Sequence, residues 1–311
     1  MLSPYKKIAV FDLETGGLSC KYNSITEIAI VVIDLETLTI VDRYTSLIKP
    51  YIDLTSVETE ALKEAKVLYK NIGAKDPETG VKTLKFKDHN ITLKNLEPLV
   101  DEIERFYLLL ESKFPDYKLT YEDILEIEAM DDYKDIMEVY FNNAYNPQAL
   151  EATKIPRELF EEEGKLEPEV FKEVLAVLEK HTVGNSRPII AGHNIGSLPR
   201  RIVKGKEKGP DGFDNPFMEK WFLNHKQYYF SLINELIFDT LKLARIRWPE
   251  LASYSLGVCA NELGLTLKEA HRALPDTEAN AKFLIKLLES LRGEGSQNAK
   301  QRTRRKFNLN F

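Results

Sequence analysis

Short apolar segments at the start of the chain have the pattern of β-strands. Residues 7–13, 25–34 and 40–48 are rich in Ile and Val and are separated by turn-forming residues. Connections this short cannot carry a crossover helix, so they favour antiparallel neighbours. Residues 188–192 form a further short apolar strand, and 235–244 read as a strand that leads into a helix. The pattern predicts a sheet that opens with an antiparallel meander.

Helical spacing of apolar residues covers much of the remaining chain. It is found in four segments: 55–71, 93–113, 213–224 and 276–291. Residues 121–181 are also largely helical, with breaks at prolines. Ser253 is a predicted N-cap of a helix that ends near Gly264, and Pro275 is a predicted first-turn proline of the last helix. Strands mixed with helices predict an α/β fold.

The charge distribution changes what the net charge of −6 implies. That net charge alone argues against a nucleic-acid partner. However, residues 120–169 hold fifteen acidic and four basic residues, whereas 292–311 hold six basic residues and one acidic residue. We expect the acidic segment to form a helical subdomain that packs away from any surface facing nucleic acid, as a docking face for another protein or as a DNA mimic. The basic tail lacks apolar periodicity and is predicted to be disordered.

Other features of composition exclude several classes of protein. Cys20 and Cys259 are too few and too far apart for a disulfide framework or a Cys-based zinc site. Apolar segments are too short to cross a membrane, and the first residues lack a signal-peptide cleavage pattern. The expected location is the cytoplasm.

Asp12 and Glu14 are the first candidates for chemistry. They follow four apolar residues of the first predicted strand, and residues two apart on a strand face the same side. Unpaired carboxylates in such a place are costly, and a hard cation such as Mg²⁺ explains them. The same Asp-Leu-Glu-Thr tetrapeptide recurs at residues 34–37, where it fits a hairpin connection. The tetrapeptide alone is therefore a weak indicator.

Two histidine motifs follow later in the chain. His193 and Asn194 come directly after a predicted buried strand. His271 precedes Asp276 by five residues at the start of the last predicted helix, where the helix dipole favours a carboxylate. A lone histidine is more often structural, so these motifs gain meaning only in combination.

The three motifs, in this order, resemble the DEDDh exonuclease family, which includes proofreading subunits, ribonuclease T and oligoribonuclease. Residues 238–245 resemble the segment before the family's last motif, and His89-Asn-Ile-Thr resembles its His-Gly-Ile-Thr turn. The resemblance covers roughly residues 5–60, 86–100, 187–196 and 212–291.

This resemblance implies an α/β domain of the ribonuclease-H-like type, a mixed sheet with flanking helices and a helical acidic insertion. The expected exonuclease domain is 1–291, with insertions at about 73–88, 114–186 and 197–211, followed by the tail 292–311.

The second motif departs from the family pattern. The family has an aspartate five residues after the histidine, but Leu198 stands there. Residues 212–217, Gly-Phe-Asp-Asn-Pro-Phe, restore the pattern if 197–211 is an insertion, which assigns the third carboxylate to Asp214. Asp211 is the rival. If the insertion displaced Asp214 from the site, the chain would be a catalytically impaired binding module.

The resemblance also implies a mechanism. Asp12, Glu14 and Asp276 would hold one divalent cation, Mg²⁺ or Mn²⁺, and Asp12 with Asp214 a second. His271 would be the general base. The substrate-binding candidates are Thr15, Gly16, Gly17, Leu18, His193 and Asn194, with Arg200, Arg201 and Lys204 of the insertion as phosphate contacts. A solvated surface loop is the alternative for the insertion, and a core leucine for Leu18.

The expected activity is release of nucleoside monophosphates from the 3′ end of DNA, with single-stranded DNA favoured. An exoribonuclease is the alternative, as is a nucleic-acid-binding or clamp-binding module. The segment 302–311 ends in Lys-Phe-Asn-Leu-Asn-Phe, which resembles peptides that dock on sliding clamps, although Lys306 stands where Gln is usual. A polymerase is a second candidate partner, and a tail packed against its own domain is the alternative.

Overall fold

The computed structural model describes thirteen stretches of the chain: residues 5–20, 23–53, 83–86, 89–92, 118–130, 137–138, 141–142, 144–196, 201–203, 206–208, 211–226, 237–265 and 272–302. Contacts divide the chain into two units. The sheet unit comprises Met1–Glu14, Ile25–Ile48 and Glu151–Phe311, and the second unit comprises Thr15–Ser24 and Lys49–Leu150.

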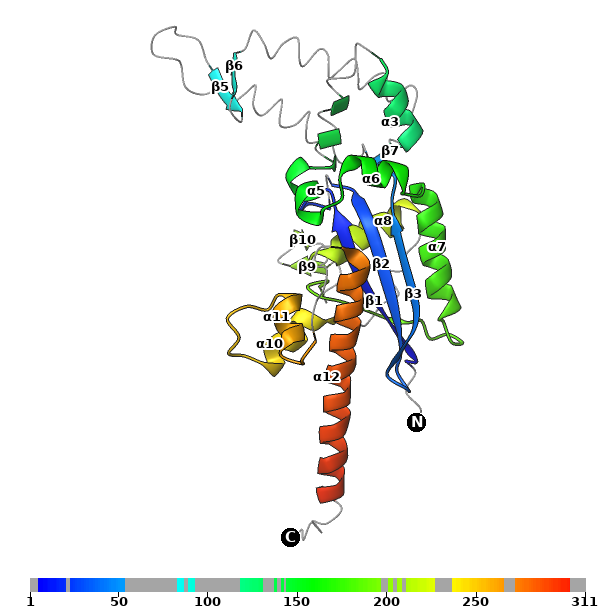
Figure 1. The fold of residues 1–311 in the computed structure, drawn as a ribbon, viewed down its shortest axis with the longest axis vertical. Coiled ribbons are helices and arrows are strands. Elements are labelled where there is room, and N and C mark those ends of the chain that lie inside the picture. Colours follow the sequence, from blue (N-terminus) through cyan, green and yellow to red (C-terminus); the bar gives the residue numbers. More distant parts are fainter. Residues whose placement is uncertain are drawn as a thin grey trace. The chain divides into compact units, whose positions relative to one another are not determined.

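A five-stranded mixed sheet forms the centre of the sheet unit (Figure 1). Its order is β11-β8-β1-β2-β3, from Ile237–Asp239, Ile189–Gly192, Lys7–Thr15, Ile25–Asp34 and Thr39–Leu47. β8 runs parallel to both β1 and β11, whereas β2 and β3 are antiparallel. The predicted opening strands are confirmed, and β1, which carries Asp12 and Glu14, lies in the middle of the order.

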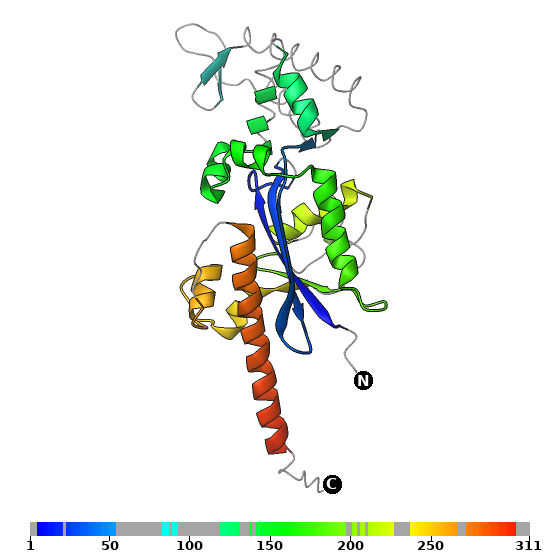
Figure 2. The same ribbon diagram turned by 45° about the vertical axis from the view of Figure 1, so that its right-hand side comes forward.

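Helices cover both faces of this sheet (Figure 2). α12 (Ala273–Arg302) lies on one face, where Ala281 and Leu284 pack against Ile8 and Val10 of β1. α7 (Glu167–Lys180) and α8 (Asp214–Asn224) lie on the other. The ring of Phe171 on α7 contacts Trp221 and Phe222 on α8 edge-on, with centroids 5.1 and 5.0 Å apart. Because β2 is buried along nearly its whole length, it needs apolar residues on both faces.

Two short helices extend the α12 side. α10 (Thr240–Arg247) follows β11 directly, and α11 (Leu256–Asn261) packs against α12. Buried Ala244, Cys259 and Phe283 form their shared core. The N-cap of α11 is Ser255 rather than the expected Ser253.

The remaining elements are small. The sheet unit also contains α6 (Arg157–Glu162) and a hairpin of β9 (Arg201–Val203) and β10 (Lys206–Lys208). The second unit contains α3 (Tyr121–Glu128) and two ribbons, β4 with β7 and β5 with β6, formed by Ile52–Asp53, Lys118–Leu119, Thr83–Phe86 and His89–Thr92. α5 (Pro147–Thr153) ends the second unit and begins the next stretch of the sheet unit.

Several expected boundaries differ in the structure. α7, placed in an expected insertion, packs against β3, where Tyr44 donates a 2.9 Å hydrogen bond to Glu173. The acidic segment 120–169, expected as one helical subdomain, is divided between the two units after residue 150. His89–Thr92, expected as a turn of the exonuclease domain, is strand β6 of the second unit. The expected helices 55–71 and 93–113 lie outside the described residues.

The last helix is longer than its pattern suggested. α12 continues to Arg302, although disorder was expected from residue 292. Gly293 and Gly295 each disfavour helix by about 1 kcal/mol, but the Glu, Gln, Ala, Lys and Arg residues around them are helix formers. Residues 303–311 lie outside the described part. Across the described chain, no helix is long and apolar enough to span a membrane.

Candidate active site

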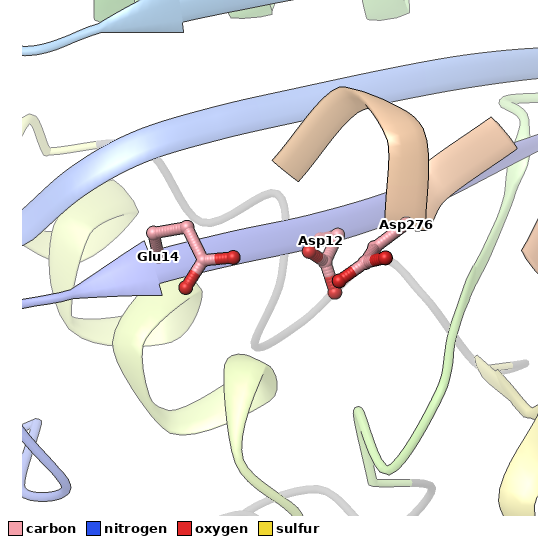
Figure 3. A group of neighbouring side chains, drawn as sticks. All are labelled: Asp12, Glu14 and Asp276. Carbon is pink, nitrogen blue, oxygen red and sulfur yellow. The ribbon is translucent and has the colours of Figure 1, made fainter. Parts of the chain in front are cut away.

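Three carboxylates from two elements converge on the α12 face of β1. Ile8 and Val10 pack under α12, and Asp12 and Glu14 continue the same alternating face of the strand. The first turn of α12 adds Asp276 (Figure 3). One oxygen from each of the three residues lies within 4.8 Å of the others. On this face of β1, the apolar residues that pack under α12 thus give way to carboxylates beside the first turn of that helix.

Asp214 is the fourth carboxylate near this strand. It is the first residue of α8 and is only 3% exposed. Burial raises its pKa to about 7, although the backbone N–H of Leu13, the neighbour of Asp12, opposes the shift. Burial, and next the charge of Asp214, raise the pKa of Asp12 well above its usual range. Asp12 and Asp214 are thus close enough to repel one another.

The residues on either side of the segment 197–211 are in direct contact with one another. A Cβ on Gly212 would lie 2.2 Å from the backbone nitrogen of Gly196, so both positions require close backbone approach. The N–H of Phe213 bonds to the carbonyl of Asn194 at 2.8 Å, and that of Asn215 to the carbonyl of Ile195 at 3.1 Å. Residues 194–196 and 212–215 therefore lie side by side, as the expectation that 197–211 is an insertion requires.

Asp211, the rival for the third carboxylate, has a different partner. Its carboxylate accepts from the Lys242 ammonium at 2.7 Å, and its side chain is 28% exposed. Asp214 instead lies beside Asp12. The geometry therefore favours Asp214 as the third carboxylate.

The carboxylate cluster fits a divalent cation. Burial, and then the charge of Glu27, raise the pKa of Glu14 to about 8. Hard cations such as Mg²⁺ prefer carboxylate oxygens, and their charge would offset this repulsion. Asp12, Glu14 and Asp276 supply such oxygens at one place.

Glu27 is a buried neighbour that the sequence reasoning missed. It lies on β2, is 3% exposed, and forms a two-pronged ion pair with Arg272. Its charge also raises the pKa of Asp12. The available signal was a single charged residue within the strand 25–33.

His193 and Asn194 serve contacts within the protein. The Nε2 of His193 donates to the carbonyl of Tyr254 at 2.8 Å, and Nδ1 lies 3.0 Å from the Thr240 hydroxyl. Burial lowers the pKa of His193, which favours the neutral ring. Asn194 has a left-handed φ of 63°, and its N–H donates to Asp239 at 3.1 Å. These contacts favour a structural role for His193 over the expected substrate contact.

The loop after β1 is held by another part of the second unit. Thr15 donates to the carbonyl of Gly17 at 2.7 Å, and the carbonyl of Gly16 accepts from the N–H of Asn146 at 2.7 Å. A Cβ on Gly16 would lie 2.0 Å from the carbonyl oxygen of Ala144. Leu18, at 89% exposed, is no core leucine. Part of the acidic segment thus contacts the expected substrate loop, contrary to the expectation that it packs away.

Some expected site residues lie outside this description. His271, Arg200 and Lys204 are not among the described residues, and Arg201 is described only as part of strand β9.

Sequence comparison finds exonuclease and polymerase relatives. The RNase_T family model, described as Exonuclease, matches residues 197–284. DNA polymerase III PolC-type of Bacillus cereus is 34% identical over 83 residues, which are 27% of this chain and 6% of that protein. DNA polymerase III subunit epsilon of Aquifex aeolicus is 41% identical over 66 residues, which are 21% of this chain and 33% of that protein. The chain thus spans a minor part of these relatives.

Comparison of folds finds a similar fold in the nuclease domain of another protein. The nuclease domain of 3′hExo, a DEDDh family member solved with rAMP, has a TM-score of 0.50 at 11% identity. The match covers 93% of this chain and 94% of that one. The fold is therefore of the ribonuclease-H-like class, with a mixed sheet and flanking helices. Over parts of its length, the chain is similar in sequence to exonucleases and to DNA polymerase III proteins.

Proposed function

We propose that this protein hydrolyses nucleic acid from the 3′ end, one nucleotide at a time, with single-stranded DNA as the favoured substrate. The observation that carries the proposal is the convergence of Asp12, Glu14 and Asp276 within 4.8 Å. Buried Asp214 adjoins the same strand. A carboxylate cluster of this kind would repel a phosphodiester unless cations were bound, so the site suits metal-dependent phosphate chemistry.

Two divalent cations, Mg²⁺ or Mn²⁺, are the proposed cofactors. Asp12, Glu14 and Asp276 would hold one, and Asp12 with Asp214 the other. When bound, such cations supply Lewis-acid polarisation and neutralise charge that develops on phosphate oxygens.

The chain's own residues would then orient the substrate and move the proton. His271 is proposed as the general base that accepts a proton from the attacking water, a role suited to near-neutral pH. Backbone groups of Thr15, Gly16 and Gly17 would contact the terminal sugar. Exposed Leu18 would pack against the terminal base, which gives its apolar surface a partner.

The preference for DNA rests on the sequence relatives. Both are named as DNA polymerase III proteins, PolC-type and subunit epsilon. The 3′hExo domain was solved with rAMP, which makes RNA the other outcome of the test.

The test uses matched 5′-labelled DNA and RNA oligonucleotides with Mg²⁺, Mn²⁺ or EDTA. We expect a ladder shortening by single nucleotides, faster on DNA, and abolished by EDTA or by Asp12→Asn. Lys180→Ser on the exposed end of α7 is the control and should retain full activity. Absence of cleavage with either metal would contradict the activity, and faster cleavage of RNA would contradict the substrate.

We infer also that residues 302–311 dock on a sliding clamp of the replication machinery. The support is the chain's own Leu309 and Phe311 in a basic, polar segment and the polymerase relatives. A peptide of residues 301–311 should bind a clamp, and Leu309→Ala with Phe311→Ala should remove that binding. A peptide without measurable affinity at high concentration would contradict the inference.

A further inference from the structure

A buried ion pair joins β2 to the start of α12, where the site carboxylate Asp276 arises. Glu27 accepts from Nε and Nη2 of Arg272, both at 3.0 Å, and from the backbone N–H of Ala273 at 3.1 Å. One carboxylate thus receives three hydrogen bonds, two of them from a guanidinium fork, which fixes direction as well as distance. All three residues belong to the sheet unit.

The Ala273 contact gives Glu27 the role of a helix cap supplied from another element. Ala273 is the first residue of α12, and its N–H is among those that a helix cannot satisfy internally. A negative charge at this end is also favoured by the helix dipole. The next turn closes normally, since the N–H of Asp276 bonds to the carbonyl of Arg272 at 3.2 Å. The pinned residues and Asp276 therefore share one turn.

We propose that Glu27 is a positioning residue that holds the first turn of α12 on β2, so that Asp276 stays within metal-ligating distance of Asp12 and Glu14. This inference rests on the proposed function for its link to catalysis. The same anchor precedes Asp276 and directly follows His271, the proposed base, in the chain.

Glu27 is the buried end of this ion pair. Its side chain is 4% exposed, whereas that of Arg272 is 37% exposed. Loss of Arg272 would leave a buried carboxylate without its main counter-charge, and such a group is costly. Partners that orient metal ligands typically change metal affinity or activity by roughly 10–100-fold when removed.

The test compares Glu27→Gln and Arg272→Gln with Arg43→Gln. Arg43 forms a second ion pair between the sheet and α12, at 2.5 Å to Glu278, but on an exposed surface. Mn²⁺ binding is measured by calorimetry, and kcat and KM on an oligonucleotide in parallel. We expect each of the first two variants to weaken Mn²⁺ binding and lower kcat by about 10-fold or more, with KM little changed, and Arg43→Gln to match the unmodified protein.

A double variant separates anchoring from other roles. If both residues act through one contact, Glu27→Gln with Arg272→Gln should cost little more than the worse single change. If Glu27→Gln abolishes Mn²⁺ binding while Arg272→Gln leaves it unchanged, Glu27 is itself a ligand and the anchor is overturned. Unchanged binding and kcat in both single variants would also overturn it.

Two further measurements distinguish loss of the anchor from failure to fold. Thermal unfolding reports whether each variant folds, and should Glu27→Gln not fold, Arg272→Lys decides. Lys keeps the charge but not the fork, so we expect partial loss of Mn²⁺ affinity, and unchanged affinity would count against the anchor. Mn²⁺ binding needs no turnover, so an inactive unmodified protein would contradict the proposed function, while the Mn²⁺ affinities of the variants would still decide the anchor.

Discussion

Asp12 and Asp214 show how burial and like charge act together at single residues. Each has a raised pKa for which burial is the largest cause, and the charge of Asp214 is the second cause at Asp12. Such groups reduce the stability of the folded protein when ionised, because folding removes them from water. Buried carboxylates of this kind are expected where a bound cation offsets the loss of folding stability.

Asp12→Asn should therefore separate function from stability. Without metal, the variant should unfold at higher temperature, with a gain on the order of 1 kcal/mol, because it removes one charge from the cluster. Hydrolysis should be lost, because the shared ligand is gone. Thermal unfolding with and without Mn²⁺ measures both effects, and a less stable variant in EDTA would contradict the argument.

Asp214 and Asp211 give a matched pair of substitutions three residues apart. Asp214→Asn should lower kcat by at least about 100-fold, since Asp214 adjoins Asp12. Asp211→Asn should leave kcat within about 2-fold, because its exposed pair with Lys242 contributes little. Steady-state hydrolysis decides, and the reverse order would return the third carboxylate to Asp211.

At the scale of elements, the loop after β1 depends on a distant segment of the second unit. The carbonyl of Ala144 accepts from the N–H of Ser24 at 3.1 Å and occupies the space where a Cβ on Gly16 would be. Tyr145 supports this arrangement, because its hydroxyl bonds to both the N–H and the carbonyl of Tyr51, at 2.7 and 2.8 Å. The loop geometry is thus set by residues that lie 120 to 128 positions further along the chain.

Gly16→Ala should displace this loop. The added Cβ would lie 2.0 Å from a backbone oxygen, so the loop or residues 144–146 must move. We expect KM for oligonucleotides to rise by roughly 10-fold or more with a smaller change in kcat, because the loop is proposed to bind substrate rather than metal. Gly257→Ala, where a Cβ meets nothing within 4 Å, is the control.

The insertion 197–211 carries five basic and two acidic residues. Replacement of its basic residues by Ser should weaken DNA binding and reduce the salt dependence of the binding constant, by about one unit of slope for each lost phosphate contact. The substituted residues are Arg200, Arg201, Lys204, Lys206 and Lys208. Lys172, Lys180 and Lys286, replaced together, form the control. Identical salt slopes for the two variants would leave the insertion as a solvated loop.

The stability of the whole molecule should respond to pH and metal together. The pKa of Glu14 is about 8 when folded, against an ordinary value of 4.5. Between these values the folded protein binds more protons than the unfolded chain, so the free energy of unfolding falls as pH rises. Asp214, with a pKa of about 7, acts in the same direction.

We therefore expect the metal-free protein to unfold at lower temperature as pH rises from about 5 to 9, and excess Mn²⁺ to raise the unfolding temperature most at the high end. Thermal unfolding across this range in EDTA and in Mn²⁺ measures the effect. Asp12→Asn should flatten the EDTA profile. A metal-free protein whose stability rises with pH in this window would contradict the assigned shifts.

Local pattern by itself determined much of this protein. The opening strands end within two residues of their expected positions, because alternating or continuous Ile and Val segments have few other stable forms. Asp12 and Glu14 share a face because a strand has a period of two, and Asp276 lies in a first helical turn. The order of the motifs was sufficient to indicate a resemblance to the DEDDh exonuclease family.

Contacts between residues far apart in the chain were decided only by the tertiary structure. It separated Asp214 from Asp211 through their neighbours, joined Gly196 to Gly212, and gave Glu27 a partner 245 positions away. It also showed that α7 packs against β3 of the central sheet. Local sequence cannot predict these contacts, because each depends on two segments that only folding brings together. Before folding, the same helix or carboxylate is compatible with more than one partner.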